Sequence, residues 1–381
     1  MKLTILSLWA HKLFDPLEPQ PFGGAELQLV TLARELARRF GVTVQFVTRG
    51  AGERREFETG GIHVVKLPYR KTGLARMAMG TVEAYRALRS LETDVYLQRC
   101  GGIETGITAR AAVQAKKPFL FMTSSAWDMD GTHARARGRL YGQCYLYGLR
   151  HAAGVICQSR DQQQRLHSDY GVNSLILRSA HAIPDQAPEQ KEGVLWVGRC
   201  EPVKNPEMFL QTAKALPNIP CTMICPPANS REMFERIQEQ ATGMENLTFL
   251  PGVSYETTET YFARHRLFVC TSEKEGFPNT YIQALKWGTP VVSFNVNPDG
   301  ILEQHAMGWC AGGDAARQQE FIQQLYFDET QWDSFSRNAR KYAKAHHDLA
   351  AISNTLYEWL KHLIAESRLP APENASGRGK A

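Results

Sequence analysis

Hydrophobic and polar positions alternate in blocks along the whole chain. Short apolar runs rich in β-branched residues predict buried strands, and longer stretches with apolar residues every three or four positions predict amphipathic helices between them. The clearest helical stretch, residues 25–39, places Leu27, Val30 and Leu36 on one side and begins directly after Gly23-Gly24. Strands that alternate with helices from end to end are typical of an α/β fold with parallel sheets.

The pattern predicts strands in both halves of the chain. In the first half they cover residues 3–8, 43–48, 63–67, 95–98, 118–122, 154–158 and 174–177. In the second half they cover residues 193–198, 221–225, 247–250, 267–270, 290–294 and 308–310. The main helices predicted there are 206–215, 230–240, 256–264, 279–287, 332–345 and 351–365.

A polar segment with two prolines, residues 183–193, separates the two sets of strands and predicts a linker. A chain of 381 residues also exceeds the size at which one core keeps growing. We therefore expect two Rossmann-like domains, 1–185 and 186–345, followed by a helix at 346–369 that packs towards the first domain. The tail 370–381, rich in Pro, Gly and polar residues, is expected to be disordered.

Composition narrows the class of protein. Hydrophobic residues make up 43% and charged residues 22%, as in a well-packed soluble protein. The formal charge of +5 is mild, so it favours an anionic partner and argues against a nucleic-acid-binding protein. The N-terminal apolar run leads into charged residues and predicts a strand, not a signal peptide, and no run approaches the ~20 apolar residues of a membrane span. These features predict a cytoplasmic protein.

A basic stretch at residues 116–150 leaves two interpretations open. Arg135, Arg137, Arg139 and Arg150 are interleaved there with Leu and Tyr side chains. Such a segment can rest on an anionic membrane surface, which would place the protein peripherally on the inner face of the membrane. The more frequent interpretation of such a pattern is an ordinary amphipathic helix with a solvated basic face.

Cysteine and carboxylate spacing does not predict a metal site. The eight Cys are spread without paired spacing, and Cys221 and Cys225 lack a second pair of ligands, so free thiols in a reducing compartment are expected. Asp128 and Asp130, two positions apart, resemble a metal-binding pair of carboxylates, but the sequence shows no partner site. We expect these two carboxylates to line the acceptor side of a cleft, with no metal.

Histidines give weaker indications. His133 and His181 are candidates for residues in the cleft, although an isolated His is more often a surface or core residue. The pair His346-His347, late in the chain, is expected to lie on a solvated helix face.

The segment 271–283 carries the most specific pattern. A strand ends at Cys270, a Gly-containing turn follows, and a helix is predicted to start near Pro278. Free backbone N–H groups at a helix start form a site for phosphate oxygens. Glu275 in the turn can accept hydrogen bonds from sugar hydroxyls, and Gln283 two turns later can reach a ribose diol. Taken alone, the same turn is also consistent with an ordinary crossover carrying an exposed Glu.

Two further segments follow the same logic. After the first strand of the second half, Gly198 allows a tight turn, and Arg199 with Lys204 supplies two cations for a diphosphate, although a surface Arg and Lys on a loop would give the same pattern. After the first strand of the first half, Gly23-Gly24 feeds a helix N-terminus. Neither the Gly-x-Gly-x-x-Gly nor the Gly-Lys-Ser/Thr pattern is present, which argues against an oxidoreductase or an ATPase.

Together these segments resemble family 4 glycosyltransferases of the GT-B fold, over nearly the whole chain. The resemblance lies in residues 23–26, in Val197-Gly198-Arg199 with Lys204, and, most specifically, in 275–280 through 288–292. It implies two Rossmann-like domains facing a cleft and retaining transfer from a nucleotide-diphosphate sugar without an essential metal or cofactor. The donor nucleotide would be of the UDP or GDP type, and the acceptor a glycan or lipid-linked glycan in bacterial surface glycan assembly.

The resemblance also implies roles for individual residues. Arg199 and Lys204 would bind the diphosphate and Glu275 the sugar, as the catalytic set. The residues expected to bind the nucleotide sugar are Gly23, Gly24, Gly198, Val253, Gly276, Phe277, Pro278, Asn279, Thr280 and Gln283, with Gly252-Val253 near the base. One position departs from the family, which expects a second Glu where this chain has Gln283. Glutamine can still hydrogen-bond a ribose, but it lacks the charge that strengthens a carboxylate's bonds.

Two other functions stay open at this stage. A sugar-nucleotide epimerase shares the architecture but acts on the nucleotide sugar alone. A non-catalytic protein that binds nucleotides or glycans is suggested only by Gln283, and the presence of Arg199, Lys204 and Glu275 argues against it.

Overall fold

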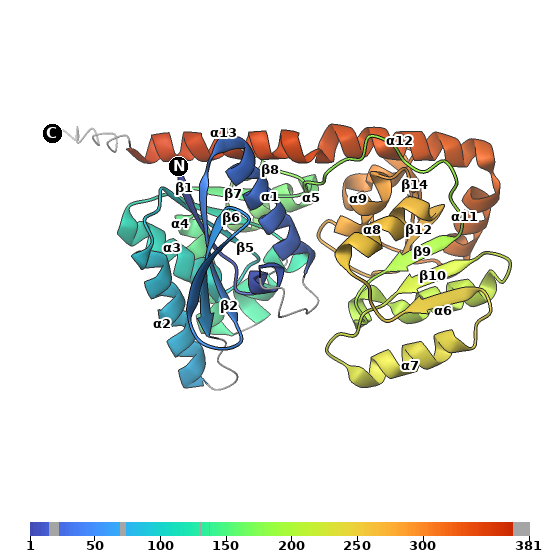
Figure 1. The fold of residues 1–381 in the computed structure, drawn as a ribbon, viewed down its shortest axis with the longest axis horizontal. Coiled ribbons are helices and arrows are strands. Elements are labelled where there is room, and N and C mark those ends of the chain that lie inside the picture. Colours follow the sequence, from blue (N-terminus) through green and yellow to red (C-terminus); the bar gives the residue numbers. More distant parts are fainter. Residues whose placement is uncertain (15–22, 69–73, 130, 137, 369–381) are drawn as a thin grey trace, which may run out of the picture.

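The structure is a computed structural model that describes residues 1–14, 23–68, 74–129, 131–136 and 138–368. The expectations for Asp130, Arg137 and the tail 370–381 concern positions outside these ranges. The described chain forms two α/β halves, one built on an eight-stranded sheet and the other on a six-stranded sheet (Figure 1). The α/β class and the two parallel sheets predicted from the sequence are confirmed.

The first sheet is parallel except at one edge. In spatial order its strands are β3 (Arg55–Thr59), β4 (Ile62–Pro68), β2 (Thr43–Gly50), β1 (Lys2–Leu6), β5 (Val95–Arg99), β6 (Phe119–Met122), β7 (Gly154–Cys157) and β8 (Leu175–Ile176). The chain order reverses at β1, which pairs with β2 on one side and β5 on the other. Ligands of open α/β sheets bind beyond the carboxyl ends of the strands at such a reversal.

The second sheet is parallel throughout and reverses in the same way. Its strands are β11 (Leu247–Leu250), β10 (Cys221–Ile224), β9 (Val194–Val197), β12 (Leu267–Cys270), β13 (Val291–Ser293) and β14 (Gly308–Cys310). The reversal lies at β9, which pairs with β10 and β12. The loops after β9 and β12 therefore begin side by side.

Helices cover the faces of both sheets. Those of the first half are α1 (Gly24–Phe40), α2 (Leu74–Ser90), α3 (Ile103–Ala115), α4 (Arg139–His151) and α5 (Arg160–Tyr170). Those that follow are α6 (Pro206–Ala215), α7 (Arg231–Thr242), α8 (Tyr255–Arg264), α9 (Asn279–Leu285), α10 (Ile301–Gln304), α11 (Ala315–Phe327), α12 (Glu329–His347) and α13 (Leu349–Arg368). The short turns are η1 (Ala10–Leu13), η2 (Ala126–Asp128), η3 (Thr132–Ala136), η4 (Pro202–Lys204) and η5 (Pro298–Gly300).

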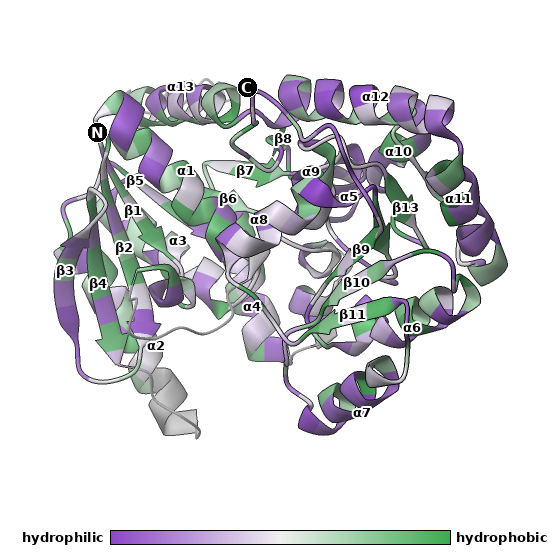
Figure 2. Ribbon diagram, turned by 45° about the vertical axis from the view of Figure 1, so that its right-hand side comes forward, coloured by the Kyte–Doolittle hydropathy of each residue, from purple (hydrophilic) through white to green (hydrophobic). Residues whose placement is uncertain are grey.

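Hydrophobic side chains concentrate on the strands and on the helix sides that face them (Figure 2). Each half has a core on both faces of its sheet. Leu3 and Ile5 of β1 lie in one core and Leu6 in the other, and β9 divides in the same way, with Trp196 on one face and Leu195 on the other. Burial on both faces explains why these strands are continuous apolar runs.

The pattern missed one strand within the described residues. Strand β3 is an exposed edge strand that pairs antiparallel with β4, and Phe57 is its only large apolar side chain. Gly60 and Gly61 join the two strands with φ of 56° and 76°, as in a two-residue hairpin turn. The Gly-Gly pair was the available signal, but the polar strand before it lacked the alternation that marks a strand.

The chain crosses between the halves twice. It passes from β8 to β9, and it passes back from α12, which packs on the second half, to α13, which packs against α1 (Figure 1). Leu356, Leu360 and Leu363 of α13 are buried in the core of the first half. The predicted return of the C-terminal helix to the first half is thus confirmed.

The segment 183–193, expected as a linker from its composition, is held to the second half. Arg340 of α12 donates hydrogen bonds to the backbone oxygens of Pro184 and Asp185, each at 3.0 Å. The Lys191 ammonium donates to the Trp287 carbonyl oxygen at 2.7 Å and to the Thr289 hydroxyl at 2.8 Å. Burial and the nearby Arg340 lower the pKa of Lys191 to about 7. The segment is therefore anchored, and the crossing point lies before it.

Candidate functional site

The loops after β9 and β12 are tied together by a short chain of hydrogen bonds. The Trp196 indole N–H donates to the Thr271 hydroxyl at 2.8 Å, and this hydroxyl donates to the Lys204 carbonyl oxygen at 2.8 Å. The Glu273 N–H donates to the Val203 oxygen at 3.0 Å. The two segments singled out in the sequence therefore converge at the carboxyl edge of the second sheet.

This convergence places Lys204 beside Glu275. The Lys204 ammonium forms an ion pair with the Glu275 carboxylate, and both side chains are only partly exposed, at 26% and 19%. Lys204 ends the short turn η4, and Asn205 after it has φ of 49°, a left-handed conformation that Asn adopts more readily than most residues. A cation and a carboxylate thus lie together at the switch point of the sheet.

Arg199, the second cation of the predicted set, does not join this pair. Its guanidinium lies 3.2 Å from the Glu201 carboxylate and is about half exposed. Gly198, directly before it, lies so close to the Trp196 ring that an added Cβ would stand 2.9 Å from the indole. Any role of Arg199 towards a diphosphate stays a prediction, since its guanidinium would have to turn away from Glu201.

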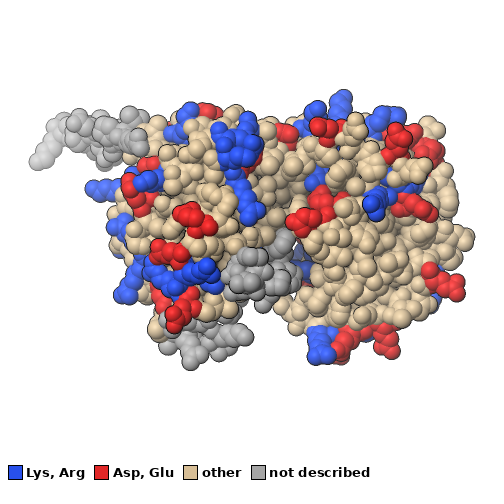
Figure 3. Space-filling model, viewed as in Figure 1, with Lys and Arg blue, Asp and Glu red and all other residues tan. Residues whose placement is uncertain are grey.

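The turn after Glu275 meets the first half of the molecule. An added Cβ at Gly276 would lie 2.9 Å from the Ser124 backbone oxygen, and one at Gly24 would lie 2.5 Å from the Asn279 amide nitrogen. A side chain at position 276 would meet backbone, whereas one at position 24 would require the Asn279 side chain to move. Residues from the carboxyl edges of both sheets therefore face each other here, and Figure 3 shows the hollow between the halves.

Helix α9 differs in detail from the prediction. It begins at Asn279 with Pro278 as an extended N-cap residue, φ −66° and ψ 118°, and it ends at Leu285, two residues earlier than expected. Phe277 is buried against His347, with the ring centres 5.5 Å apart. Thr280 follows on the helix, half-buried.

Gln283 lies on α9 and is bound by a carboxylate from the neighbouring helix α8. Its amide nitrogen donates to Glu259 Oε1 at 3.0 Å, while the Trp287 indole donates to Glu259 Oε2 at 3.0 Å. The Lys286 ammonium lies 2.7 Å from Glu259 Oε2. Burial alone would raise the pKa of Glu259, but Lys286 and the donated hydrogen bonds hold it below its usual value. Sequence reasoning missed this carboxylate.

The predicted base-binding residues lie at the end of β11. Gly252 has φ of 140° and would bring a Cβ within 3.4 Å of Pro226. Val253 is partly buried and packs against the core beneath α8 and α9. These positions neighbour α8, the helix that carries Glu259.

Asp128 does not line the cleft, which corrects the sequence-based expectation. Its carboxylate is fully buried and accepts hydrogen bonds from the N–H groups of Gly101 at 2.7 Å, Ser124 at 2.6 Å and Ser125 at 3.0 Å. His133, also buried, lies 3.4 Å away. Asp128 therefore shapes the loop that contacts Gly276, but it cannot touch an acceptor.

The two histidines at the crossing point are structural. The His181 N–H donates to the His347 oxygen at 2.8 Å, and Leu349 donates back to the His181 oxygen at 2.9 Å. His347 is fully buried, and its Nδ1 bonds the Ser179 oxygen at 2.7 Å, so the expectation of a solvated histidine pair is wrong for this residue. The 3.6-residue pattern could not show that α12 ends inside the junction of the two halves.

Burial keeps both of these rings neutral. Burial and the charge of Lys286 lower the pKa of His181 to about 3, and burial lowers that of His347 well below its usual value. His181 also hydrogen-bonds the Gln28 amide nitrogen, at 3.1 Å from its Nε2. It is thus a residue of the crossing point and not a group facing the cleft.

A second contact between the halves was also missed. The carboxylate of Asp299, in η5 of the second half, accepts hydrogen bonds from Arg160 N at 3.0 Å and Asp161 N at 3.2 Å. These are the first N–H groups of α5 in the first half, so Asp299 caps a helix across the cleft. Because 139 residues separate Asp299 from Arg160, no local pattern could reveal this cap.

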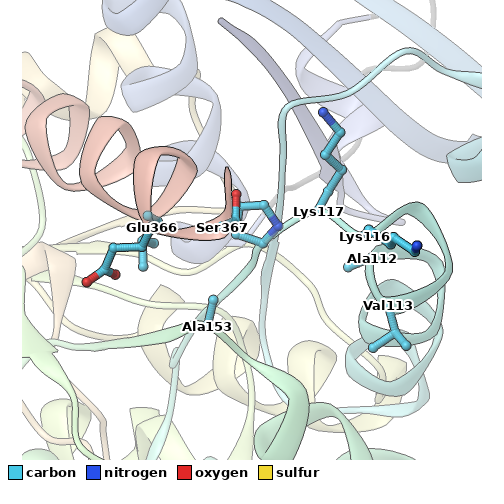
Figure 4. A pocket seen from close by; sticks show the side chains of 9 residues that line it. Ala112, Val113, Lys116, Lys117, Ala153, Glu366 and Ser367 are labelled. Atoms are coloured by element: carbon cyan, nitrogen blue, oxygen red, sulfur yellow. The ribbon is translucent and has the colours of Figure 1, made fainter. Parts of the chain in front are cut away.

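Two surface pockets lie outside this site. One is at the amino ends of β6 and β7 beside α13, where Lys117, Ala153 and Glu366 are among its lining residues (Figure 4). Open α/β sheets bind ligands beyond the carboxyl ends of their strands, so this pocket, at the amino ends, is separate from the Lys204–Glu275 site. The other is an apolar groove between α2, α3 and α4, lined by Val82, Ile107 and their neighbours.

Within the described residues, no three His, Cys, Asp or Glu side chains cluster as metal ligands would. None of the eight cysteines forms a disulfide. In the same part of the chain, no helix combines the length and apolar character that crossing a bilayer requires.

Comparison with known proteins gives two family matches that together span most of the chain. Residues 23–176 match the glycosyl transferase 4-like domain, and residues 180–342 match the glycosyl transferases group 1. The D-inositol 3-phosphate glycosyltransferase of Mycolicibacterium smegmatis is 28% identical over 110 residues, 28% of this chain and 25% of that protein. The corresponding enzyme of Mycobacterium tuberculosis is 29% identical over the same length, 23% of that protein. The match thus spans about a quarter of these relatives.

Solved structures show the same fold over nearly the full length. Sucrose-phosphate synthase from Thermosynechococcus elongatus has a TM-score of 0.75 at 17% identity, covering 96% of this chain and 100% of that one. An α,α-trehalose-phosphate synthase (UDP-forming) from Burkholderia vietnamiensis has a TM-score of 0.71 at 10% identity, covering 95% and 99%. At these identities the likeness concerns the fold alone.

Proposed function

The chain belongs to the family 4 type of glycosyltransferase with the GT-B fold, and from this premise we propose that it transfers a sugar from a nucleotide-diphosphate sugar to an acceptor hydroxyl with retention of configuration. The observation that supports the proposal most is the convergence of Lys204 and Glu275, from two separate loops, at the switch point of the second sheet. This edge faces the first half across the contacts of Gly24 and Gly276.

Each of the two groups has a distinct task in this proposal. Lys204 exchanges its contact with Glu275 for the diphosphate and stabilises the negative charge that develops as the bond from the anomeric carbon to the phosphate oxygen breaks. Glu275, released from Lys204, accepts hydrogen bonds from the sugar hydroxyls. The acceptor oxygen forms the new bond to the anomeric carbon, and its proton passes to the departing phosphate oxygen on the same face.

We propose that these side chains act without a resident metal or cofactor. Positive charge at the diphosphate comes from Lys204 and, once its guanidinium turns from Glu201, from Arg199. Transfer should therefore continue at full rate in excess EDTA. A loss of activity that added Mg²⁺ restores would contradict this part of the proposal.

The donor is proposed to be a UDP or GDP sugar, and thermal shifts with UDP, GDP and ADP would identify the nucleotide. A nucleotide held at 100 times its dissociation constant adds ~2.7 kcal/mol to the free energy of unfolding. Transfer to an added acceptor, with release of free nucleoside diphosphate, separates a transferase from an epimerase, which keeps the sugar on the nucleotide. Stabilisation by nucleotide without any turnover would instead indicate a binding protein.

We further propose that the acceptor is a glycan or lipid-linked glycan, and that helices α2, α3 and α4 rest on the inner face of a bacterial membrane during surface glycan assembly. Leu140 is 78% exposed, and Met79, Val82 and Val113 are also exposed on these helices. From 79 to 90, 103 to 117 and 139 to 151 the chain carries seven Lys and Arg against two Glu. An apolar face with cations around it suits an anionic membrane. Over the face shown in Figure 3, Lys and Arg are interspersed with Asp and Glu.

Sedimentation with lipid vesicles tests the membrane contact. We expect binding to vesicles that contain phosphatidylglycerol, weaker binding to pure phosphatidylcholine, and loss of binding in high salt. Arg110→Glu, on the groove, should weaken binding. Arg231→Glu, an exposed arginine of α7, serves as the control and should leave it unchanged.

A further inference from the structure

Helix α9 and the turn that follows it present three donors to one carboxylate. Gln283, Lys286 and Trp287 are spaced so that they lie on one side of the helix, and each bonds Glu259 of α8. Tyr255 lies one turn before Glu259 on α8, and burial together with the nearby Glu259 charge raises the pKa of its hydroxyl. Glu259 therefore receives bonds on both oxygens, and its position is fixed from several directions.

This arrangement determines which way the Gln283 amide faces. A carboxylate can only accept hydrogen bonds, so the amide group that faces Glu259 must be the N–H₂. Rotating the amide by half a turn would bring its oxygen against Glu259 Oε1, where the nitrogen now lies at 3.0 Å. Two acceptors at that distance repel, and the rotated form is disfavoured.

The other end of the amide is left as an open acceptor. Within the described residues the Gln283 oxygen receives no hydrogen bond, although the residue is only 7% exposed. The oxygen has no partner among these residues and is not fully buried, so solvent reaches it. A ligand that binds here meets an acceptor, and the group that satisfies it is a donor such as a hydroxyl.

The charge of Glu259 strengthens that acceptor. A hydrogen bond from an amide N–H to a carboxylate is charge-assisted, and it polarises the amide so that its oxygen becomes more negative. The carboxylate itself stays paired with Lys286, which is 5% exposed, so no net charge is left buried. The negative charge that a glutamate at position 283 would carry thus lies on Glu259, next to the Gln283 side chain.

We propose that Glu259 is a positioning residue that orients Gln283 with its amide oxygen towards the ligand, as the acceptor for a ribose hydroxyl of the nucleotide. The inference rests on the proposed function, because it takes the ligand to be a nucleoside diphosphate. It adds Glu259, which lies on a different helix outside the recognised motif, to the residues that shape the nucleotide site. It also predicts a specificity, because the site selects a ribose hydroxyl as donor and binds a ribose without that hydroxyl more weakly.

The first part of the test measures how the protein discriminates between riboses. The probes are the nucleoside diphosphate that stabilises the protein most and its 2′-deoxy and 3′-deoxy forms, with affinity measured by calorimetry. We expect the full protein to bind at least one deoxy form about tenfold more weakly, as the loss of one hydrogen bond of roughly 1.4 kcal/mol implies. In Glu259→Gln the new amide N–H₂ donates to the Gln283 oxygen, so the Gln283 amide turns round and its N–H₂ faces the ligand. The loss of affinity for the deoxy form should then fall below about twofold.

Two further variants separate positioning from simple stability. Lys286→Met removes the buried cation but keeps the Glu259–Gln283 hydrogen bond, so it should lower the melting temperature and retain the discrimination. Gln283→Glu alone places two carboxylates together and should abolish discrimination along with much of the affinity. The exchanged double variant Glu259→Gln/Gln283→Glu restores one carboxylate and one amide, and it should regain the penalty for the deoxy form.

The outcomes are distinguishable. If no nucleoside diphosphate binds the unaltered protein, the proposed function fails. If nucleotides bind but neither deoxy form is penalised, or if Glu259→Gln keeps the full penalty, only the role of Glu259 is overturned. A double variant that is folded yet does not regain discrimination would likewise overturn it.

Discussion

Two lysine–glutamate pairs flank helix α9 and differ in how they are enclosed. Lys204–Glu275 precedes the helix, joins two loops, and leaves both side chains partly exposed. Lys286–Glu259 follows the helix, with side chains 7% and 15% exposed, and Glu259 also receives bonds from Gln283 and Trp287. The two carboxylates are similarly exposed, and the pairs differ in the lysine: Lys204 is 26% exposed and Lys286 7%, so the first is the open pair and the second the closed pair.

The difference shows which pair can take part in binding. Solvent-exposed ion pairs contribute about 0–1 kcal/mol. Because the Lys204 side chain still reaches solvent, it can leave Glu275 for a phosphate at a lower cost than a lysine in a fully buried pair. Breaking a buried pair from one side leaves a charge without a partner and costs about 3–5 kcal/mol. Glu259 is thus suited to hold a neighbouring side chain in place, and Lys204 to change partners.

The largest effect should come from breaking the buried pair. Lys286→Met leaves the Glu259 carboxylate, whose side chain is 15% exposed, without its cation. It should lower the free energy of unfolding by about 3 kcal/mol, the lower end of the cost of breaking a buried pair, measured by urea denaturation. Adding Glu259→Leu to this variant removes the uncompensated charge and should recover most of the loss. A single variant as stable as the unaltered protein would show that solvent and the bonds from Gln283 and Trp287 are enough to stabilise the Glu259 charge.

Breaking the open pair should act on catalysis and not on stability. Lys204→Ala removes the cation at the diphosphate and should lower turnover about 10²–10³-fold while the melting temperature changes little. Lys274→Ala, an exposed lysine in the same turn, is the matched control and should keep its turnover. Equal loss of fold and activity in Lys204→Ala would contradict its assignment to the diphosphate.

A smaller effect is expected where the halves meet around the open pair. Asp299→Ala removes the cap that the second half supplies to α5, at a cost of about 0.5–2 kcal/mol. Because this contact bridges the halves, we expect a larger radius of gyration in solution scattering, and a nucleotide should reverse the change. Asp299→Asn retains an acceptor oxygen and should stay closer to the unaltered protein. An unchanged radius in Asp299→Ala would mean that the crossing at His181 alone holds the halves.

The smallest effect is the pH dependence of the closed pair. The pKa of Glu259 in the folded protein lies below its usual value of 4.5, so folding favours its charged form. The stability it contributes is present above pH 4.5 and is lost as the pH falls through the folded pKa. Denaturation midpoints followed down from pH 6 should therefore fall less in Glu259→Gln than in the unaltered protein. If the midpoints of the two proteins fall in parallel with pH, the titration of Glu259 does not contribute to the loss of stability.

Much of the site was predictable because its signals are local. The apolar runs placed β9 and β12, and the residues directly after them, Gly198 to Lys204 and Thr271 to Glu275, had to lie at the carboxyl edge of a parallel sheet. The prediction that Lys204 and Glu275 belong to one site needed only that order of strands. The partners of these residues were not predictable in the same way: Arg199 lies against Glu201, and Asp128 is buried among backbone N–H groups.

The sequence by itself determined the α/β architecture, the strands with two buried faces and the glycine turns that lead into α1 and α9. Only the tertiary structure decided that His347 is buried at the crossing point, that Asp299 caps a helix of the other half, and that Glu259 holds Gln283. The reason is physical. Periodicity and turn chemistry depend on neighbours along the chain, whereas the burial and hydrogen bonding of a polar side chain depend on groups that folding brings from elsewhere.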